Sequence, residues 1–202
     1  MIEFSILVPT VPGRVSTMFW RLLKQLEHQA FGLPVEIIGL YDNKKMSVGA
    51  KRNNLLRMVS GKYFAFIDDD DRIESTYVVD ILNAIRENPG VDVITFDIAS
   101  YINGVLRHNC HYSLQFDYRE TETEWFGKPA HTHVWRTGLV GDIDFPKKNF
   151  GEDFEWVKLA CTRAHTEAHI PKTLYHYFWD QRITETRGKE NLLAGIEHLK
   201  ED

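Results

Sequence analysis

The first hundred residues alternate short apolar runs with segments whose apolar residues recur at helical spacing. The apolar runs that predict strands are residues 3–8, 35–41, 62–67 and 91–101. The first predicted helix carries Val15, Met18, Phe19, Leu22, Leu23 and Leu26 on one face. Strands that alternate with single helices are typical of βαβ crossovers, so we expect an α/β fold with a mostly parallel central sheet flanked by helices.

Two more helices are predicted from their first and last residues. Ser47 is expected to cap a helix that stops near Gly61, and Ser75 to cap a helix that ends before Asn88. A serine hydroxyl at such a position accepts a hydrogen bond from a free backbone N–H of the first helical turn. Both helices therefore fit between predicted strands.

The second half of the chain is less regular and predicts a smaller antiparallel part. A strand at residues 105–114 is expected to return along its predecessor across Asn103-Gly104. Residues 115–130 are interpreted as a loop, and residues 133–140 fit neither a helix nor a strand clearly. The remaining expected elements are a helix at 152–164, a strand at 173–179 and a closing helix at 192–200.

Composition and charge exclude several classes of protein. A net charge of −5 and a pI near 6.0 argue against a nucleic-acid coat protein, which needs a broad basic face. No stretch approaches the roughly 18 to 20 apolar residues of a membrane span, and the N-terminus lacks the features of a signal peptide. Cys110 and Cys161 have no metal-type spacing. We expect a cytoplasmic protein with two free thiols and no membrane insertion.

Polar residues follow three successive predicted strands, at the point where each strand ends. Thr10 follows the first strand, Asp42 the second, and four aspartates, residues 68–71, the third. In an open parallel sheet, ligands bind outside the carboxyl ends of the strands. We therefore expect these side chains to converge on one binding site.

Four adjacent carboxylates repel one another, and each raises the pKa of its neighbours unless a cation offsets the repulsion. Mg²⁺ or Mn²⁺ does so with hard oxygen ligands, and keeps positions for phosphate oxygens and water. A metal that carries a diphosphate is the interpretation we favour. The alternative is an acidic turn before a helix, whose N-terminus favours negative charge.

Four segments, taken in order, resemble family 2 glycosyltransferases of the GT-A fold. They are SILVPT, EIIGLYDN, AKRNNLLRMVSGKYFAFIDDDD and GEDFEW, within about residues 3–160. The resemblance implies one Rossmann-like GT-A domain over residues 1–202. Its nucleotide-sugar-binding half would cover about residues 1–100, and its acceptor-binding half about residues 101–202.

The resemblance also implies a donor site for a nucleoside diphosphate sugar, with UDP favoured as the nucleotide. Pro9 and Thr10 would lie beside the nucleotide, with Arg14 in the same substrate-binding set. Asp42 would bond the base or ribose, although Asn43 stands where the family often has a second aspartate. Arg52 would lie near the base or the diphosphate.

The aspartates would hold Mn²⁺ or Mg²⁺ through a D-x-D pair. Asp68 and Asp70 form that pair, with Asp70 bonding the metal directly and Asp69 contributing to substrate binding. A second register, in which Asp69 pairs with Asp71, stays open. His176, in LYHYFW, is expected to be a further metal ligand.

On the acceptor side, Asp153 in GEDFEW matches the family's catalytic base and would deprotonate the acceptor hydroxyl. Direct displacement with one base would invert the anomeric configuration. Glu152 is assigned to substrate binding, and the alternative is that both carboxylates only stabilise a helix start. His131 and His133 alternate along a possible strand, so they are expected to line the acceptor pocket, or one of them to replace His176. Trp135 and Trp156 are interpreted as sugar-stacking residues.

Three other functions stay open. A nucleotidyltransferase shares the sheet and the metal, but VPTVPGR is a poor glycine-rich phosphate loop. A non-catalytic nucleotide-sugar-binding module would bind the donor without turnover. A phage-encoded transferase, located in the host cytoplasm, would glycosylate hydroxylated bases of DNA. It would need a local basic patch, for which the candidates are Arg107, Arg136, Lys147, Lys148 and Arg163.

Overall fold

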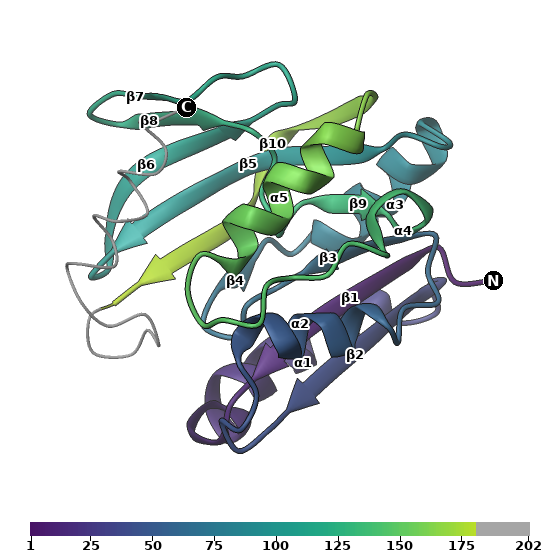
Figure 1. Cartoon of the computed structure of the whole chain (residues 1–202), viewed down its shortest axis with the longest axis vertical. Helices are drawn as coiled ribbons and strands as arrows, with labels where there is room; N and C mark the ends of the chain where they lie inside the picture. Colours follow the sequence, from purple (N-terminus) through teal and green to yellow (C-terminus); the bar gives the residue numbers. More distant parts are fainter. Residues whose placement is uncertain (181–202) are drawn as a thin grey trace.

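The computed structural model of the chain describes residues 1–180, and the closing helix expected at residues 192–200 lies outside them. The described residues form one mixed sheet of ten strands with helices on both faces (Figure 1). Among these residues, no helix has the length and apolar character needed to cross a membrane.

The first half follows the expected alternation of strands and helices. Its elements are β1 Phe4–Thr10, α1 Trp20–Ala30, β2 Val35–Tyr41, α2 Val48–Leu56, β3 Tyr63–Phe66, β4 Arg72–Ile73, α3 Tyr77–Glu87 and β5 Val93–Ile102. A 3₁₀ turn at Pro12–Arg14 and a π-helical turn at Val15–Phe19 lead into α1. The four strands expected from the apolar runs are confirmed, while the two-residue strand β4 was not anticipated.

The second half contains more strands than the sequence indicated. Its elements are β6 Val105–Tyr112, β7 Arg119–Glu120, β8 Glu124–Gly127, β9 Val134–Arg136, α4 Thr137–Val140, α5 Glu152–Arg163 and β10 Glu167–Trp179. The expected loop at residues 115–130 is wrong, because it contains β7 and β8. β7 and β8 form a short antiparallel hairpin, and β8 also pairs in parallel with β6, so this hairpin joins the sheet through its second strand.

The sheet is parallel around β1 and mixed elsewhere. β1 lies between β2 and β3 and runs parallel to both. β9 runs antiparallel to its two neighbours and separates β3 from β5. β10 runs parallel to β5. It also pairs antiparallel with β4, the two-residue strand that follows the aspartates directly in the sequence. The mostly parallel sheet is therefore confirmed, and the unassigned residues 133–140 supply the strand inserted into it.

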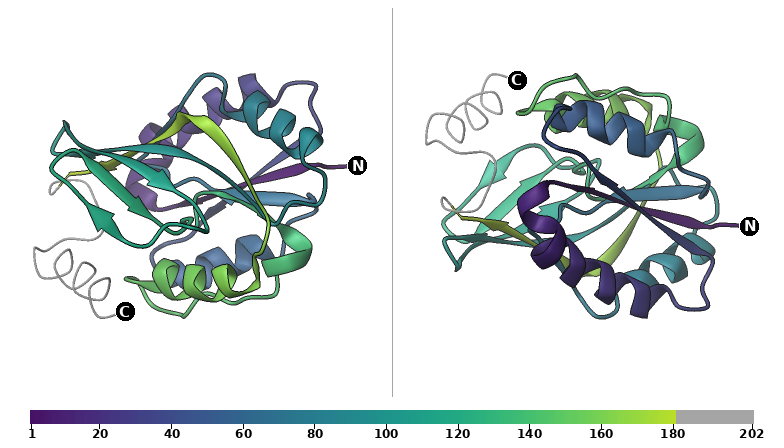
Figure 2. Two further views of the ribbon diagram at one scale, coloured as in Figure 1. Left: turned by 90° about the horizontal axis from the view of Figure 1, so that it is seen from above. Right: turned by 90° about the horizontal axis from the view of Figure 1, so that it is seen from below.

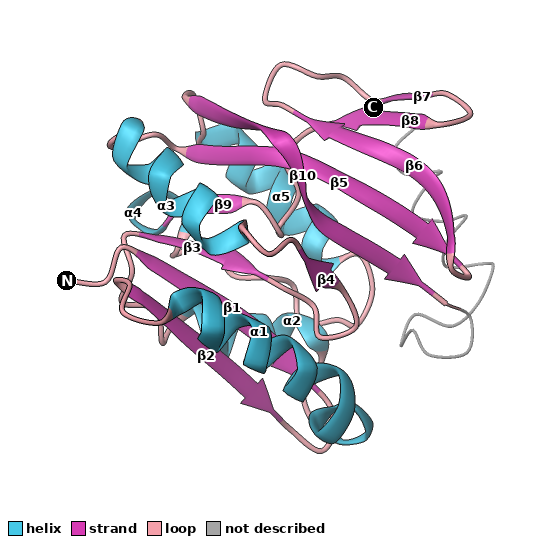
Figure 3. Ribbon diagram, turned by 180° about the vertical axis from the view of Figure 1, so that it is seen from behind, coloured by secondary structure: helices cyan, strands magenta, loops and turns pink. Residues whose placement is uncertain are grey.

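Two apolar cores lie on opposite faces of the sheet. α1 and α3 cover one face, which is turned toward the viewer in Figure 3. α2, α4 and α5 cover the opposite face, and Figure 2 shows both layers of helices. Leu22 and Leu26 of α1 are buried in the first core, as their helical spacing predicts. Trp135 and Trp156 are buried in the second.

Local signals for turns and caps have mixed outcomes. The Ser47 hydroxyl accepts a hydrogen bond of 3.3 Å from the Ala50 N–H, which confirms that cap. α3 instead begins after Thr76, without a side-chain cap, so the expected Ser75 cap is wrong. β5 turns into antiparallel β6 across Asn103 and Gly104, both of which have positive φ, as expected.

Candidate active site

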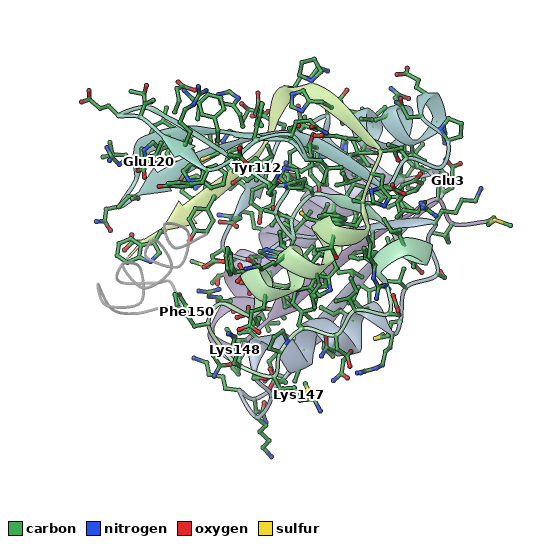
Figure 4. The ribbon with its side chains drawn as sticks, turned by 45° about the horizontal axis from the view of Figure 1, so that its top comes forward. Glu3, Tyr112, Glu120, Lys147, Lys148 and Phe150 are labelled. Atoms are coloured by element: carbon green, nitrogen blue, oxygen red, sulfur yellow. The ribbon has the colours of Figure 1, made fainter. Side chains whose placement is uncertain are left out.

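A cavity of about 790 Å³ opens at the carboxyl ends of β1 and β3, beside the start of α5. Its lining residues include Tyr112 of β6 and, from the loop before α5, Lys148 and Phe150, which Figure 4 labels. The lining residues that the sequence assigned to a site are Pro9, Thr10, Arg14, Arg52, Asp68, Asp69, Asp70, His131, Glu152 and Asp153. The fold therefore gathers most of the expected donor and acceptor residues in one place.

Arg14 links the second and third aspartates of the run. Asp69 is only 2% exposed, and its carboxylate accepts hydrogen bonds from the Thr10 hydroxyl at 2.6 Å and from Arg14 at 2.7 Å. The other terminal nitrogen of Arg14 lies 2.9 Å from Asp70. Because Thr10 is the last residue of β1 and Asp69 follows β3, these bonds join the two strand ends.

The fourth aspartate is held by β10. Asp71 is 1% exposed and accepts hydrogen bonds from the Tyr175 hydroxyl at 2.6 Å and from the Phe178 N–H at 2.8 Å. The Tyr175 oxygen in turn accepts from the Asp68 N–H at 3.2 Å. Hydrogen bonds thus hold the buried side chains of Asp69 and Asp71 in place. The side chains of Asp68 and Asp70 are 28% and 14% exposed, respectively, and line the cavity.

Arg52 is the cation beside the first aspartate. It is 4% exposed, and its guanidinium lies 3.1 Å from Asp68 and forms an ion pair with Glu152. Burial by itself would raise the pKa of Asp68, but the combined effects of Arg52 and His131 outweigh it and hold that pKa well below its usual range. Burial does raise the pKa of Glu152, against the opposing effect of Arg52. Through these two ion pairs, Arg52 connects the end of β3, at Asp68, with the start of α5, at Glu152.

Close packing between α2 and the loop before α5 makes that ion pair reachable. Gly49 lies one turn before Arg52, and a Cβ at this position would collide with the Pro146 carbonyl and contact Glu152. Asn53 also exchanges two hydrogen bonds with the Phe145 backbone. The helix that carries Arg52 is thus fixed against the segment that carries Glu152.

The other three carboxyls remain electrostatically unfavourable. The pKa values of Asp69, Asp70 and Asp71 are all raised, that of Asp70 to about 6. Burial is the largest cause, and repulsion by neighbouring aspartates adds to it. Arg14 opposes the shift at Asp69 and Asp70. The protein's own arginines therefore relieve only part of the repulsion.

The unrelieved charge of Asp70, together with the more exposed carboxylate of Asp68, fits a divalent cation. In residues 1–180, no group of three or more His, Cys, Asp or Glu side chains is arranged to hold a metal ion by itself. Mg²⁺ usually takes one or two carboxylates and completes its shell with substrate phosphates and water. The donor set therefore suits a metal that binds together with a diphosphate.

Asp153 stands on the wall of the cavity at the start of α5. Its side chain is 39% exposed, and one carboxylate oxygen accepts the Phe154 N–H while the other lies 3.5 Å from His131 Nδ1. His131 Nε2 lies 3.0 Å from a nitrogen of Arg52, which only donates. Nε2 therefore accepts, the ring proton is on Nδ1, and it faces Asp153.

Asp42 occupies the expected strand end but contacts its own loop. Its carboxylate accepts the N–H groups of Lys45 at 2.8 Å and Met46 at 2.9 Å and forms an ion pair with Lys51. Burial would raise the pKa of Asp42, but these contacts lower it. Lys51, which also donates to the Thr10 carbonyl, lines the cavity, whereas Asp42 does not.

Two histidines do not lie where we expected them. His176 lies on β10 between Tyr175 and Tyr177, which line the cavity, so its side chain points to the other face and contacts Glu74 at 2.7 Å. His133 is fully buried, accepts the Ala130 N–H on Nδ1 and donates from Nε2 to the Phe96 carbonyl. Burial lowers the pKa of His133 to about 3. The geometry removes His176 from the metal site and His133 from the acceptor pocket.

Both expected sugar-stacking tryptophans are core residues. Trp135 and Trp156 are fully buried, and their indole N–H groups donate to the carbonyls of Ala130 and Ile143. The aromatic residues that do line the cavity are Tyr112, Phe150, Phe154, Tyr175, Tyr177, Phe178 and Trp179. Side chains alternate between the two faces of a strand, so the strand pattern of residues 175–179 places Tyr175, Tyr177 and Trp179 on one face. That pattern was the sequence signal for these three cavity-lining residues.

The candidate basic patch is largely neutralised. Arg136 pairs with Asp92, Arg163 with Asp142 and Lys148 with Glu155. Arg107 donates to a backbone carbonyl. These contacts give no support to a DNA backbone as a partner.

Comparisons with known proteins agree with this geometry. The family model of Glycosyl transferase family 2 matches residues 16–144. The crystal structure of S. aureus TarS 1–349 superposes with a TM-score of 0.65 at 21% identity, and the match covers 88% of this chain and 60% of the TarS chain. The complex of TarS 1–349 with UDP-GlcNAc superposes with a TM-score of 0.64 at 20% identity, and that match covers 96% of this chain and 61% of the TarS chain. The protein A197 from STIV has a TM-score of 0.55 at 18% identity over 89% and 87% of the two chains. No curated protein matches significantly.

The chain spans about 60% of the length of these TarS structures. At such identities, the likeness shows the fold alone, and it confirms the α/β GT-A architecture that the sequence motifs implied. The residue roles stay predictions.

Proposed function

Because the chain belongs to Glycosyl transferase family 2, we propose that it transfers a sugar from a nucleoside diphosphate donor, with UDP favoured, to a hydroxyl acceptor. The observation that carries the proposal is the single cavity in which Asp68 and Asp70 meet the exposed carboxylate of Asp153. TarS, which shares the fold, has been crystallised with UDP-GlcNAc and with UDP, which supports a UDP-linked donor.

The donor diphosphate lies against the aspartates in this proposal. Asp68 and Asp70 are the residues that would hold Mg²⁺ or Mn²⁺, and the metal would supply Lewis-acid neutralisation of the diphosphate charge. Thr10 and Arg14 keep Asp69 fixed behind them, and Tyr175 does the same for Asp71. The protein thus presents its two outward carboxylates in a prepared orientation, which lowers the cost of ordering them on binding.

Asp153 acts as the base. Its exposed carboxylate takes the proton of the acceptor hydroxyl while the hydroxyl oxygen attacks the anomeric carbon, and the configuration inverts. His131 is a positioning residue, because its Nδ1–H faces one oxygen of Asp153 and Arg52 fixes its tautomer. Arg52 also contacts Asp68, so one side chain connects the donor wall to the acceptor wall.

Titration calorimetry with UDP, GDP, CDP and TDP, each with and without Mn²⁺, tests the donor assignment. We expect UDP to bind, and only with the metal. Turnover is then measured with the UDP-sugars as release of UDP, in the presence of hydroxyl acceptors. Absence of binding of every nucleotide under both conditions would reject the proposal.

A further inference from the structure

A second cavity, of about 550 Å³, lies between residues 113–116 and the first part of β10. Asp97 and His111 line it, and they point to the sheet face opposite to Ile98, which lines the candidate active site. Ligand pockets commonly measure roughly 300–1,000 Å³. The proposed transfer reaction uses none of the side chains that point into this second cavity.

His169 presents a lone pair to this cavity. The Thr95 hydroxyl donates its only hydrogen to Glu167 at 2.6 Å, so its oxygen accepts from His169 Nδ1 at 3.1 Å. In the neutral ring, Nε2 is then an acceptor. The His169 side chain is 41% exposed, so a ligand can reach that nitrogen.

Asp97 provides a second acceptor next to it. One carboxylate oxygen of Asp97 accepts from His111 Nδ1 at 3.0 Å and lies 4.0 Å from His169 Nε2. That separation is too long for a hydrogen bond. Two acceptors therefore face the same space, and both are satisfied by a ligand with two neighbouring donors.

The rest of the wall is fixed and partly apolar. Glu167 accepts hydrogen bonds of 2.8 Å from both the Ser113 hydroxyl and the Leu114 N–H, which holds the 113–116 loop in place. The Phe126 ring is covered by His111 on one side and contacts Arg119. Phe116 packs its ring against Phe126 at 5.6 Å and stays 37% exposed. It is therefore the aromatic surface that this cavity offers to a ligand.

We propose that this cavity is a second, non-catalytic binding site for a saccharide. Neighbouring ring hydroxyls donate to Asp97 and His169, and the C–H face of the sugar packs on Phe116. Hydroxyl donors suit the site better than a metal ion, because no three His, Cys, Asp or Glu side chains in residues 1–180 are arranged to hold one. The proposal goes beyond the transfer reaction and does not depend on it.

Ligand-observed and protein-observed NMR on the full chain test the site. The probes are the methyl glycosides of glucose, galactose and N-acetylglucosamine, with ethanolamine hydrochloride as a cationic comparison. We expect at least one glycoside to bind in the millimolar range and to shift the amide signals of residues 113–116. Phe116→Ala and His169→Ala should each weaken binding by about fivefold or more. Phe31→Ala, at a phenylalanine that is 90% exposed elsewhere, should not change it.

Three outcomes would overturn the site: no glycoside bound at about 50 mM, binding that both variants leave unchanged, or tighter binding of ethanolamine than of every glycoside. UDP binding with Mn²⁺ is measured in the same samples and should be equal in Phe116→Ala and wild type. UDP binding without glycoside binding rejects this site alone. Glycoside binding that Phe116→Ala removes, in a protein that binds no nucleotide, upholds this site and rejects the proposed transferase function.

Discussion

The hydroxyl of Tyr175 donates a 2.6 Å hydrogen bond to the carboxylate of Asp71, although 104 positions separate the two residues. The same oxygen accepts the Asp68 N–H. One tyrosine on β10 therefore fixes both ends of the aspartate run that follows β3. The arrangement of the acidic run depends on a strand that forms almost at the end of the described chain.

Tyr175→Phe should destabilise the protein and weaken metal-dependent donor binding. The change leaves one oxygen of the buried Asp71 carboxylate without its donor, which costs about 1–3 kcal/mol. It also removes the acceptor of the Asp68 N–H and so frees the turn that carries Asp68. Urea denaturation measures the first effect, and calorimetry with UDP and Mn²⁺ the second. Tyr177→Phe is the matched control for stability, because it keeps the bond to Asp71. Equal stability of the two variants would contradict the role given to Tyr175.

Asp70→Ala should abolish metal-dependent UDP binding and at the same time stabilise the free protein at neutral pH. Burial and neighbouring aspartates raise the pKa of Asp70 to about 6, so its charge opposes folding above that pH. Calorimetry and thermal denaturation test the two effects separately. Asp144→Ala, at an exposed aspartate paired with Arg57, is the control. Undiminished UDP binding would move the metal away from Asp70.

Asp153→Asn should leave UDP binding intact and reduce transfer by about a hundredfold or more, because the amide cannot take the acceptor proton. Initial rates at saturating donor measure the loss. Glu155→Gln, on the same turn of α5, controls for the loss of one negative charge near the helix start. Near-normal transfer by Asp153→Asn would place the base elsewhere, at Glu152 or His131.

His111 should make stability depend on pH. Its Nδ1 and Nε2 lie 3.0 Å from Asp97 and 2.7 Å from Glu124, and two carboxylate acceptors require both ring nitrogens to donate. Burial lowers the pKa of His111, but the two carboxylates outweigh it and raise that pKa overall. The stabilisation is therefore complete below the ordinary histidine pKa of about 6.5 and is lost as pH rises through the raised value.

Urea denaturation of wild type and His111→Gln over a pH series measures that effect. The difference in unfolding free energy should be largest near the ordinary histidine pKa and should shrink as the pH rises. His28→Gln, at an exposed histidine of α1, should show no such trend. A difference that is constant with pH would mean that the His111 ring is neutral in the folded protein.

Much of the donor half could be read from local patterns. Thr10 and Asp68 end apolar runs, and a parallel arrangement brings such ends together because successive crossovers share one direction. Ser47 caps its helix through its own hydroxyl, which depends only on neighbouring residues. The strands β7, β8 and β9 escaped prediction because each has only two to four residues, too few to show a periodic pattern. β8 and β9 also depend on pairing with strands elsewhere in the chain.

The sequence by itself determined the α/β class, the convergence of the strand ends and the family, because apolar period and motif order are properties of the chain. Only the tertiary structure decided which side chains face the cavity. β10 shifts register against β5 between Ile170 and Tyr175, and a shift of one residue moves every following side chain to the other face. That shift places Tyr175 toward the aspartates and His176 away from them. The alternation along residues 175–179 puts Tyr175 and His176 on opposite faces of β10, but only the pairing of two distant strands decides which of them faces the aspartates.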